Sequence, residues 1–577
     1  MNIQKKLITY ITKAALKSNI SKKNIKLIKL SSKSNFGHYQ INGIIEISKK
    51  INTTIKKTSD SIILYLNSKK IFEKIEYSHP GFINIFLKKQ WLSKKIENIT
   101  YCRRLDIKKK KNKNIIIDYS SPNMAKEMHV GHLRSTILGD VMSRVIEFMG
   151  YNVIRINHIG DWGLQFGMMI ALLKRKNIVI NEKNISLKEL EILYQKSKIL
   201  YEKSENFKKE SEKYLTKLNN SHHHYISLWK KIIQTTVIEN QKIYKKLNVK
   251  LKKKNITGES FYIPMIRNMI SDLKKKKIAM ENDGKTIIYL DEIKNKKGEK
   301  MGVVIQKKNN NFLYSTIDIA CLKYRIETLK AKRIIYYTDV RQKQHLKQIQ
   351  IIAKKAGYIK KKIKIEHHEF GMVLNKKNQP FKTRDGKLIK LKTLIKKSIQ
   401  KSIKIIKKKN PSFNNKKILY LSKIIGISAI KYADLSKNRK KNYIFDWKNM
   451  LSFNGNTALY IQYTYTRIQS IIKKSKYSIR QLNVKCILNT DLEIKLSIKL
   501  LQFEEIITSM IKDGKPHILC LYLFQISSLF TTFYEKYPII YTSTIKTQKS
   551  RIKLSFLIGK TIKLGLKILG IPTLKFL

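Results

Sequence analysis

The sequence predicts an α/β fold with a doubly wound parallel sheet, an α+β domain before it and an all-α bundle after it. A strand, helix and strand pattern between residues 115 and 156 predicts the sheet, because a right-handed βαβ crossover is the usual unit of parallel sheets. Helical periodicity of apolar residues in 446–577 predicts the bundle.

The βαβ pattern is readable element by element. Ile115–Ile117 is a β-branched run typical of a buried parallel strand, and the polar turn Ser120–Asn123 ends it. Apolar residues then recur at three- and four-residue steps, which predicts a helix that stops at Gly150. These residues are Leu133, Ile137, Leu138, Val141, Val145 and Phe148. Val153–Ile156 supplies the second strand.

Two histidines and a glycine stand at the amino end of the predicted helix, in His129-Val-Gly131-His132. Ligands of parallel sheets bind beyond the carboxyl ends of the strands, and free N–H groups at a helix amino end favour phosphate. Gly131 lets a flat ring such as adenine approach the backbone, while two imidazoles donate to phosphate oxygens as charge develops. From these residues alone, a histidine pair that packs on a helix face or binds a metal is an equal alternative.

The segment Ser121–Asp140, which contains this histidine pair, resembles the HIGH signature of class I aminoacyl-tRNA synthetases in its arginyl-tRNA synthetase form. Other segments similar to the family are Asn157–Gly167, Tyr314–Ala320, Gly371–Leu374, Phe381–Gly386, Tyr432–Arg439, Gly455–Ala458, Pro516–Tyr522 and Phe533–Glu535. The resemblance implies a Rossmann-like class I core and arginine–tRNA ligase activity. L-arginine would react with ATP, and the arginyl group would pass to the 3′-terminal adenosine of tRNA(Arg), releasing AMP and diphosphate. His158–Asp161 lacks the second histidine of the signature, and we interpret it as a turn after the second strand.

The resemblance also implies which residues handle ATP and its Mg²⁺. The expected ATP contacts are His129, Gly131, His132, Gly371 and Met372. The second class I signature, normally Lys-Met-Ser-Lys-Ser, corresponds to 376–386, where its first lysine is missing. Family members that lack this lysine carry one just before the HIGH segment, which here is Lys126. The expected catalytic residues, acting by electrostatic stabilisation without a protein-bound metal, are His129, His132, Lys126, Lys382 and Arg384.

Arginine needs a pocket for a planar cation with five donors, and carboxylates are its best acceptors. The family match implies that arginine is bound by Asp118, Ser121, Asn123, Tyr314, Asp318 and Gln342. Asp318 lies on an apolar segment that we take as strand-like, where an unpaired carboxylate would be costly to bury. A site with such acceptors rejects lysine by about 10⁴ to 10⁵ without editing, so no editing domain is expected.

Composition limits the class of protein and its partners. The 577 residues are 42% hydrophobic and 28% charged, which is enough for several globular domains. Lys and Arg number 120 against 40 Asp and Glu, and a formal charge of +80 favours a polyanionic partner such as RNA. Lysine is also spread through every segment together with Ile and Asn, so drift in an AT-rich, reduced symbiont genome explains an equal share of the charge.

Cysteine spacing and hydropathy indicate the compartment. The four cysteines lack CxxC spacing, which argues against a zinc knuckle and a disulfide framework. The amino-terminal stretch is too polar for a signal sequence, and no run approaches eighteen apolar residues. We expect a cytoplasmic monomer with no membrane and no DNA partner.

Three domains are expected. They are residues 1–105, 106–445 with a helical insertion at about 180–310 and connecting helices at about 390–445, and 446–577. By resemblance the first contacts the tRNA elbow, although His38 stands where the family usually has Asp, and the third binds the anticodon. The residues expected to contact tRNA are Phe36, Gln40, Tyr460, Tyr463 and Arg467. Each tyrosine fits packing within the bundle equally well.

Two other classes of protein are alternatives. A non-catalytic, synthetase-like RNA-binding protein would keep the charge and the helical carboxyl-terminal domain but lose the site residues. A class I synthetase for another amino acid would have a different pocket. Retention of the site residues argues against the first of these; they are His129, His132, Asn123, Asp318 and Gln342.

Overall fold

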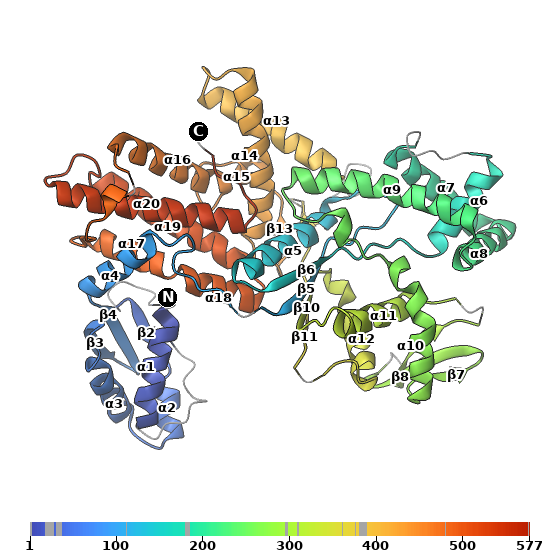
Figure 1. Cartoon of the computed structure of the whole chain (residues 1–577), viewed down its shortest axis with the longest axis horizontal. Helices are drawn as coiled ribbons and strands as arrows, with labels where there is room; N and C mark the ends of the chain where they lie inside the picture. Colours follow the sequence, from blue (N-terminus) through green and yellow to red (C-terminus); the bar gives the residue numbers. More distant parts are fainter. Residues whose placement is uncertain are drawn as a thin grey trace.

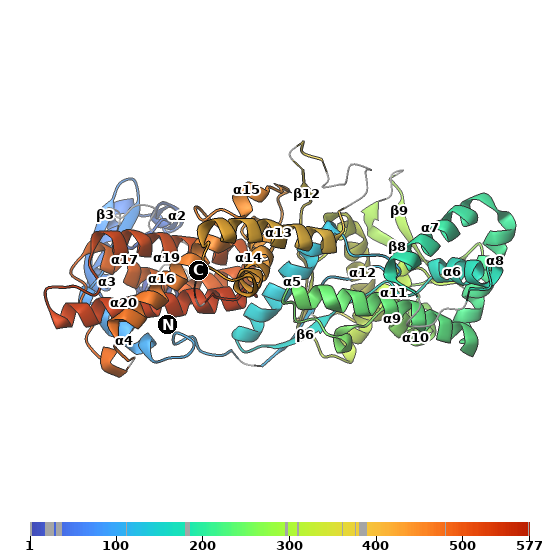
Figure 2. The same ribbon diagram turned by 90° about the horizontal axis from the view of Figure 1, so that it is seen from above.

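The protein is elongated, with a helical bundle at one end and helices of the insertion at the other (Figures 1 and 2). The computed structural model describes residues 3–17, 28–30, 37–110, 112–178, 185–294, 298–308, 311–360, 362–375, 377–379, 389–478, 480–574 and 576. The parallel sheet lies between the two ends, so substrate-binding elements are near the middle of the long axis (Figure 2).

The central sheet is parallel throughout and has the strand order β11-β10-β5-β6. Its strands are β5 (Asn114–Asp118), β6 (Asn152–Ile156), β10 (Arg333–Tyr336) and β11 (Lys364–His367). Helix α5 (Val130–Phe148) connects β5 to β6, which confirms the predicted βαβ unit and the fold class. Gly139 makes the crossover close, because a Cβ at this position would lie 2.2 Å from the Tyr119 ring. The β5 carboxyl end and the α5 amino end therefore meet at one edge of the sheet.

The amino-terminal domain is α+β, as predicted. An antiparallel sheet of order β1-β2-β4-β3 packs with helices α1 to α3. Its elements are α1 (Ile3–Lys17), β1 (Ile28–Leu30), β2 (Tyr39–Ile41), α2 (Ile44–Lys50), α3 (Ile55–Asn67), β3 (Phe72–Ser78), β4 (Phe82–Leu87) and α4 (Lys89–Thr100). In Figure 1 this domain hangs below the carboxyl-terminal bundle, far from the insertion.

Between β6 and β10 the chain forms two further layers. The first is helical: α6 (Leu164–Arg175), α7 (Leu187–Lys203), α8 (Glu205–Asn219) and α9 (His223–Lys246). The second packs helices on an antiparallel sheet: η3 (Lys253–Asn255), η4 (Glu259–Tyr262), α10 (Ile263–Lys275), β7 (Met280–Asn282), β8 (Lys285–Lys294), β9 (Lys300–Gln306) and α11 (Tyr314–Glu327). After β10, η5 (Val340–Gln342) and α12 (Lys343–Lys355) lead to β11, and α12 packs on β8 of the same antiparallel sheet. Asp283 and Gly284 turn β7 into β8 with φ of 49° and 69°, as expected for turn residues.

Helix α11 corrects one expectation. The segment that carries Asp318 is helical, not strand-like. It reads as a strand because it is apolar on nearly all sides, and the structure buries both Ile317 and Ile319 as well as Cys321. A short apolar run that is buried all round cannot be assigned to helix or strand by periodicity.

The carboxyl-terminal part is helical, as predicted. The connecting helices are α13 (Leu391–Lys409) and α14 (Asn415–Leu435), and β12 (Val373–Leu374) pairs in parallel with β13 (Tyr443–Ile444). The remaining elements are α15 (Trp447–Met450), α16 (Ala458–Ser475), η6 (Arg480–Leu482), α17 (Asp491–Leu501), α18 (Phe503–Asp513), α19 (His517–Lys536) and α20 (Ile545–Ile568). Among the described residues α19 alone is long and apolar enough to cross a membrane, and here it packs against α16, α17, α18 and α20.

Candidate active site

The segment His129–His132, called the histidine loop below, presents two hydrogen-bond donors at the amino end of α5. His129 Nδ1 accepts the Gly131 N–H at 3.1 Å, and His132 Nδ1 accepts the His129 N–H at 3.1 Å. A neutral ring whose Nδ1 accepts must carry its hydrogen on Nε2. Both Nε2–H groups are therefore available to an anion, and the two ring centroids lie 4.0 Å apart.

Burial keeps both rings neutral. It lowers the pKa of His132 to about 3, with the neighbouring His129 adding to the effect. Burial also lowers the pKa of His129, and the charge of Lys126 acts in the same direction. Gly131 is required beside them because a Cβ there would lie 2.9 Å from His129 Cε1. The loop thus offers neutral side-chain donors. The first N–H groups of α5 are already bonded, Val130 to the Ile389 carbonyl, Gly131 to His129 Nδ1 and His132 to the His129 carbonyl, so the expected free N–H groups are not present there.

The loop between β5 and α5 is held in an unusual backbone conformation. Ser120, Ser121 and Ala125 have φ of 77°, 45° and 59°, values that residues other than glycine seldom adopt. The Ser121 N–H donates to Asn157 Oδ1 at 3.0 Å, and the Ser120 N–H donates to Ser135 Oγ at 2.9 Å. Such conformations persist only where surrounding contacts enforce them, and they concentrate at ligand sites.

Asp318 lies between two imidazoles on the side of the sheet covered by α11. His345 Nε2 lies 2.6 Å from Asp318 Oδ2, and His158 Nε2 lies 3.6 Å from Oδ1. His158 Nδ1 lies 3.1 Å from the Thr257 carbonyl, which can only accept, so Nδ1 carries the hydrogen. Burial opposes ionisation of Asp318, but the hydrogen bond with His345 and the charge of His158 lower its pKa overall.

Glu259 is a second carboxylate of this pocket that the sequence reading missed. It is 9% exposed, and its Oε2 has no hydrogen-bond partner. Burial raises its pKa to about 8, and the charges of Asp161 and Asp318 add to the increase. Burial also raises the pKa of Tyr314, with the charge of Glu259 as the next cause, so Tyr314 and Asp318 both lie near Glu259. Sequence periodicity gives no signal for Glu259, which lies on the four-residue helix η4.

The segment His158–Asp161 follows β6 as a turn, but it belongs to this pocket. His158 reaches Asp318, and a Cβ on Gly160 would lie 3.0 Å from Asn123 Oδ1. Asp161 is held by Ser260, whose N–H and Oγ–H donate to its two oxygens at 2.9 and 2.8 Å. The turn therefore connects the β5–α5 loop to Glu259 and Asp318.

Asp118 is engaged in a buried ion pair. It is 3% exposed, and Arg325 Nη2 lies 2.6 Å from its Oδ2. The Ser121 hydroxyl donates to Oδ1 at 3.2 Å. Because both oxygens already have partners within the chain, Asp118 differs from Asp318 and Glu259 as an acceptor for a substrate cation.

The other predicted substrate residues lie around the same sheet edge. Asn123 is exposed and pairs through its backbone with Gly160, while Gln342 is exposed at the start of α12. The Gly371 carbonyl accepts from Arg134 Nη1 at 2.6 Å, which ties this segment to α5. Met372 is 44% exposed, and its N–H donates to the side chain of Asn442 at 2.7 Å.

Of the three cations predicted to bind phosphate, the structure describes only Lys126. Lys126 Nζ lies over the Tyr194 ring, 4.2 Å from its centroid, so in this structure its ammonium contacts α7. Lys382 and Arg384 lie outside the described residues. Neither position therefore adds to the geometry of the site.

Two of the residues predicted to contact tRNA belong to the amino-terminal domain. Gln40 lies on β2, where its Nε2 donates to Asn84 Oδ1 at 2.9 Å. Phe36 lies outside the described residues.

The other three lie on α16 of the bundle. Tyr460 is half-buried, and its hydroxyl bonds with Thr531 at 3.2 Å. Arg467 Nη2 donates to the Tyr463 hydroxyl at 3.0 Å, and the Arg467 guanidinium stacks over Tyr534, which is 41% exposed. All three side chains are partly buried and have partners within the chain, and Tyr463 also packs edge-on against Phe453.

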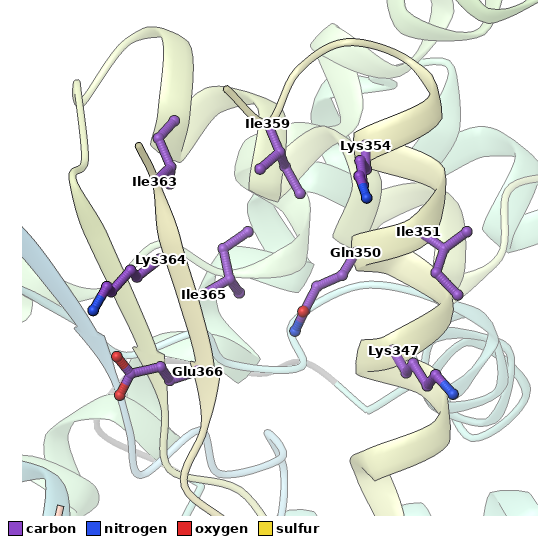
Figure 3. Close-up of a pocket in the computed structure, with 9 residues that line it drawn as sticks. All are labelled: Lys347, Gln350, Ile351, Lys354, Ile359, Ile363, Lys364, Ile365 and Glu366. Carbon is purple, nitrogen blue, oxygen red and sulfur yellow. The ribbon is translucent and has the colours of Figure 1, made fainter. Parts of the chain in front are cut away.

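A separate groove of about 450 Å³ lies between α12 and the edge strand β11 (Figure 3). Gln350 of α12 and Ile365 of β11 point toward each other across it, whereas Ile351 lies on the other side of α12 in this view (Figure 3). The lining residues are Lys347, Gln350, Ile351, Lys354, Ile359, Ile363, Lys364, Ile365 and Glu366. They include none of the predicted substrate residues.

Comparisons with known proteins agree with this geometry along the whole chain. The family model "tRNA synthetases class I (R), catalytic domain" matches residues 95–447. "Arginyl tRNA synthetase N terminal domain" matches 1–87, and "DALR anticodon binding domain" matches 461–577.

Individual relatives are similar over their full length. The arginine–tRNA ligase of Buchnera aphidicola subsp. Schizaphis graminum is 52% identical, with 100% of both chains covered. That of Wigglesworthia glossinidia brevipalpis is 49% identical over 99% of both chains. The crystal structure of arginyl-tRNA synthetase from Plasmodium falciparum superposes with a TM-score of 0.85 at 32% identity, and all of both chains is covered. The chain therefore belongs to the arginyl-tRNA synthetase family of class I aminoacyl-tRNA synthetases.

Proposed function

We propose that this chain activates L-arginine with ATP and transfers the arginyl group to tRNA(Arg), with the residues described above in specific roles. The observation that carries this assignment is the pairing of two sites at one sheet edge. One offers neutral donors to a triphosphate, and the other offers two carboxylates to a guanidinium. ATP and arginine, the substrates of the first reaction step, have these two chemistries.

ATP binds at the amino end of α5. The Nε2–H groups of His129 and His132 donate to phosphate oxygens, and Gly131, Gly371 and Met372 line the space for the adenosine. The arginine carboxylate attacks the α-phosphorus in line, and the bond to diphosphate breaks. Because both rings are neutral donors with fixed hydrogens, they stabilise the added charge on the phosphorus without transferring a proton. We keep Lys126, Lys382 and Arg384 as cations for the diphosphate end.

The arginine side chain enters the space between α11 and η4. Asp318 and Glu259 accept the guanidinium N–H groups, Tyr314 covers it, and the amino acid head contacts Ser121 together with Asn123 and Gln342. We revise the role of Asp118: its ion pair with Arg325 supports the pocket wall, and it acts through Arg325 and Ser121 rather than on the substrate.

This pocket supports discrimination against lysine. A guanidinium satisfies two carboxylates by parallel N–H donors, whereas an ammonium is a point charge that leaves acceptors unpaired. Sites that depend on such hydrogen bonds reject analogues by about 10⁴ to 10⁵, which supports a synthetase without an editing step.

We propose that Mg²⁺ accompanies the triphosphate as part of the nucleotide substrate. Across the part of the chain that the structure describes, no group of three or more His, Cys, Asp or Glu side chains is arranged to hold a metal ion. The ion would neutralise phosphate charge when ATP carries it in.

Transfer to tRNA forms the second step. The 2′-hydroxyl of the terminal adenosine attacks the carbonyl of arginyl-adenylate, which gives arginyl-tRNA and AMP. We propose that the amino-terminal domain, residues 1–105, contacts the tRNA elbow through Phe36 and Gln40. Residues 446–577 would bind the anticodon with Tyr463 and Arg467 stacking on unpaired bases, and with Tyr460 supporting them. We place the enzyme in the cytoplasm as a monomer that uses neither membrane nor DNA.

ATP–pyrophosphate exchange with each of the twenty amino acids, with and without tRNA(Arg), tests the assignment. We expect exchange with arginine when tRNA is present. Exchange with another amino acid would move the chain to a different specificity, and no exchange with any of them would support the non-catalytic alternative. Robust exchange without tRNA would refute the tRNA requirement that the family implies.

A further inference from the structure

Lys390 lies directly beside the histidine loop, although it is remote in sequence. The Val130 N–H donates to the Ile389 carbonyl at 2.9 Å, and the Leu391 N–H donates to the Met128 carbonyl at 2.8 Å. His129 and Lys390 form an antiparallel bridge between these two bonds. The backbone of Lys390 is thus fixed against the residue that we assign to the ATP phosphates.

Two carboxylates hold the ammonium of Lys390. Its Nζ forms an ion pair with Glu127, which precedes the histidine loop, and lies 3.1 Å from Glu191 Oε2 on α7. An ammonium has three N–H donors, so these two acceptors leave one donor unused. The side chain is 41% exposed, which leaves that third donor open to a ligand.

Lys390 adds a second cation beside the predicted Lys126. Lys126 Nζ faces the Tyr194 ring, and its charge lowers the pKa of His129, so it lies near the histidine loop. The backbone bridge with His129 places Lys390 there as well, and Glu191, which binds its ammonium, raises the pKa of His129 against that effect.

We propose that Lys390 is a further ATP-binding residue, whose third N–H donates to the β- or γ-phosphate while Glu127 and Glu191 keep the ammonium beside His129. The inference rests on the proposed function, because it takes His129 as a phosphate contact. Lys390 then supplies the positive charge that the incomplete second signature lacks. Glu127 and Glu191 are positioning residues that restrict a flexible side chain before ATP arrives.

A bracing role and a phosphate-binding role predict different effects for the two ends of the ion pair. If Lys390 only braces α7 against the histidine loop, Lys390→Gln and Glu191→Gln break the same contact and weaken ATP use equally. If Lys390 binds phosphate, loss of its charge weakens ATP binding strongly, whereas Glu191→Gln leaves the ammonium in place, held by Glu127, and has a much smaller effect on the KM for ATP.

The experiment compares inhibition of arginylation by pyrophosphate and by AMP, together with the KM for ATP, in full-length enzyme. For Lys390→Gln we expect the Ki of pyrophosphate and the KM for ATP to rise about 10- to 100-fold, the scale of one charged hydrogen bond. The Ki of AMP should stay within about twofold. Lys390→Arg should recover most of the loss, and Lys392→Gln, which removes an exposed lysine two residues away, is the matched control.

Equal changes in the pyrophosphate and AMP constants of Lys390→Gln, or equally impaired ATP use in Lys390→Gln and Glu191→Gln, would overturn the proposal. Should Lys390→Gln fail to fold, the wild-type enzyme decides: pyrophosphate, and not AMP, should protect Lys390 from acetylation by an amine-reactive reagent, and equal protection by both or by neither would overturn the proposal. Arginylation by the wild-type enzyme is measured in parallel. If the wild-type enzyme is active, a negative result refutes the role of Lys390 and leaves the proposed function standing.

Discussion

Arginine binding should release a proton from Glu259. In the empty pocket burial raises its pKa to about 8, so at pH 7 roughly nine of ten molecules carry the protonated acid. A guanidinium placed between Glu259 and Asp318 stabilises the charged carboxylate and lowers its pKa by about 3 units, to well below 7, so that bound Glu259 is almost fully ionised at pH 7. Each arginine bound at pH 7 should therefore release about 0.9 proton, and at pH 8 about 0.5.

The same shift sets the affinity. Ionising a group of pKa about 8 at pH 7 costs about 1.4 kcal/mol, and the cost falls as the pH approaches 8. Arginine should then bind about fivefold more tightly at pH 8 than at pH 7. The sign is fixed, since the bound state prefers the carboxylate and a higher pH supplies it.

Calorimetric titration of arginine in phosphate and in Tris buffer measures the release, because the two buffers differ in ionisation enthalpy. Repeating the titrations at pH 8 tests the predicted fall in release from about 0.9 to about 0.5 proton. Glu259→Gln should abolish the release and weaken binding. Equal heats in both buffers at pH 7 and pH 8 would refute the reasoning.

Three further predictions address other groups. Asp118→Asn should lower the free energy of unfolding by about 3 to 5 kcal/mol, because Arg325 would stay buried without its counter-charge. Guanidinium denaturation measures this free energy. Unchanged stability together with lost arginine affinity would instead show that Asp118 contacts the substrate directly. His132→Ala should slow single-turnover adenylate formation by about 10² to 10³, and an unchanged rate would exclude it from the site. Glu505 accepts a hydrogen bond from the Tyr39 hydroxyl at 3.0 Å, and burial raises the pKa of Glu505 to about 7. The folded state therefore holds the proton more tightly than the unfolded state, and the stability that protonated Glu505 contributes is lost as the pH rises from about 4.5 through 7. Thermal unfolding of Glu505→Gln between pH 5 and 8 should lack that decline; parallel profiles for both proteins would contradict it.

The sequence was sufficient for the parts of the fold that local patterns specify. The strands β5 and β6 and helix α5 follow from β-branched runs and a 3.6-residue stripe, and the histidine loop follows from its place between them. Helix α11 was not predicted from the sequence, because a helix that is buried on nearly all sides shows no apolar periodicity. The resemblance to the family identified Asp318 and Tyr314 as candidate arginine-binding residues, whereas periodicity alone would have identified neither.

Long-range pairing was beyond the sequence. Asp118 and Arg325 are 207 residues apart, and only the fold shows that the acid at the end of β5 is already neutralised. Glu259 gives the opposite case, an acid with one oxygen unpaired in a segment that shows no periodic pattern. Both look alike in sequence, as single carboxylates near apolar residues. Whether a carboxylate is available to a substrate depends on what the fold places beside it.

This distinction explains how a chain of charge +80 can bind a cation. The long-range field attracts ATP and tRNA and opposes arginine, so arginine affinity must come from short-range contacts. The pocket meets this need with acids in different states: Asp161 is held by Ser260, Asp318 by His345, and Glu259 stays protonated until the substrate arrives. A pocket with every acid ionised and unpaired would be costly to fold. Protonation of Glu259 avoids that cost in the free enzyme. Glu259 then ionises when arginine binds, so that its negative charge forms beside the guanidinium.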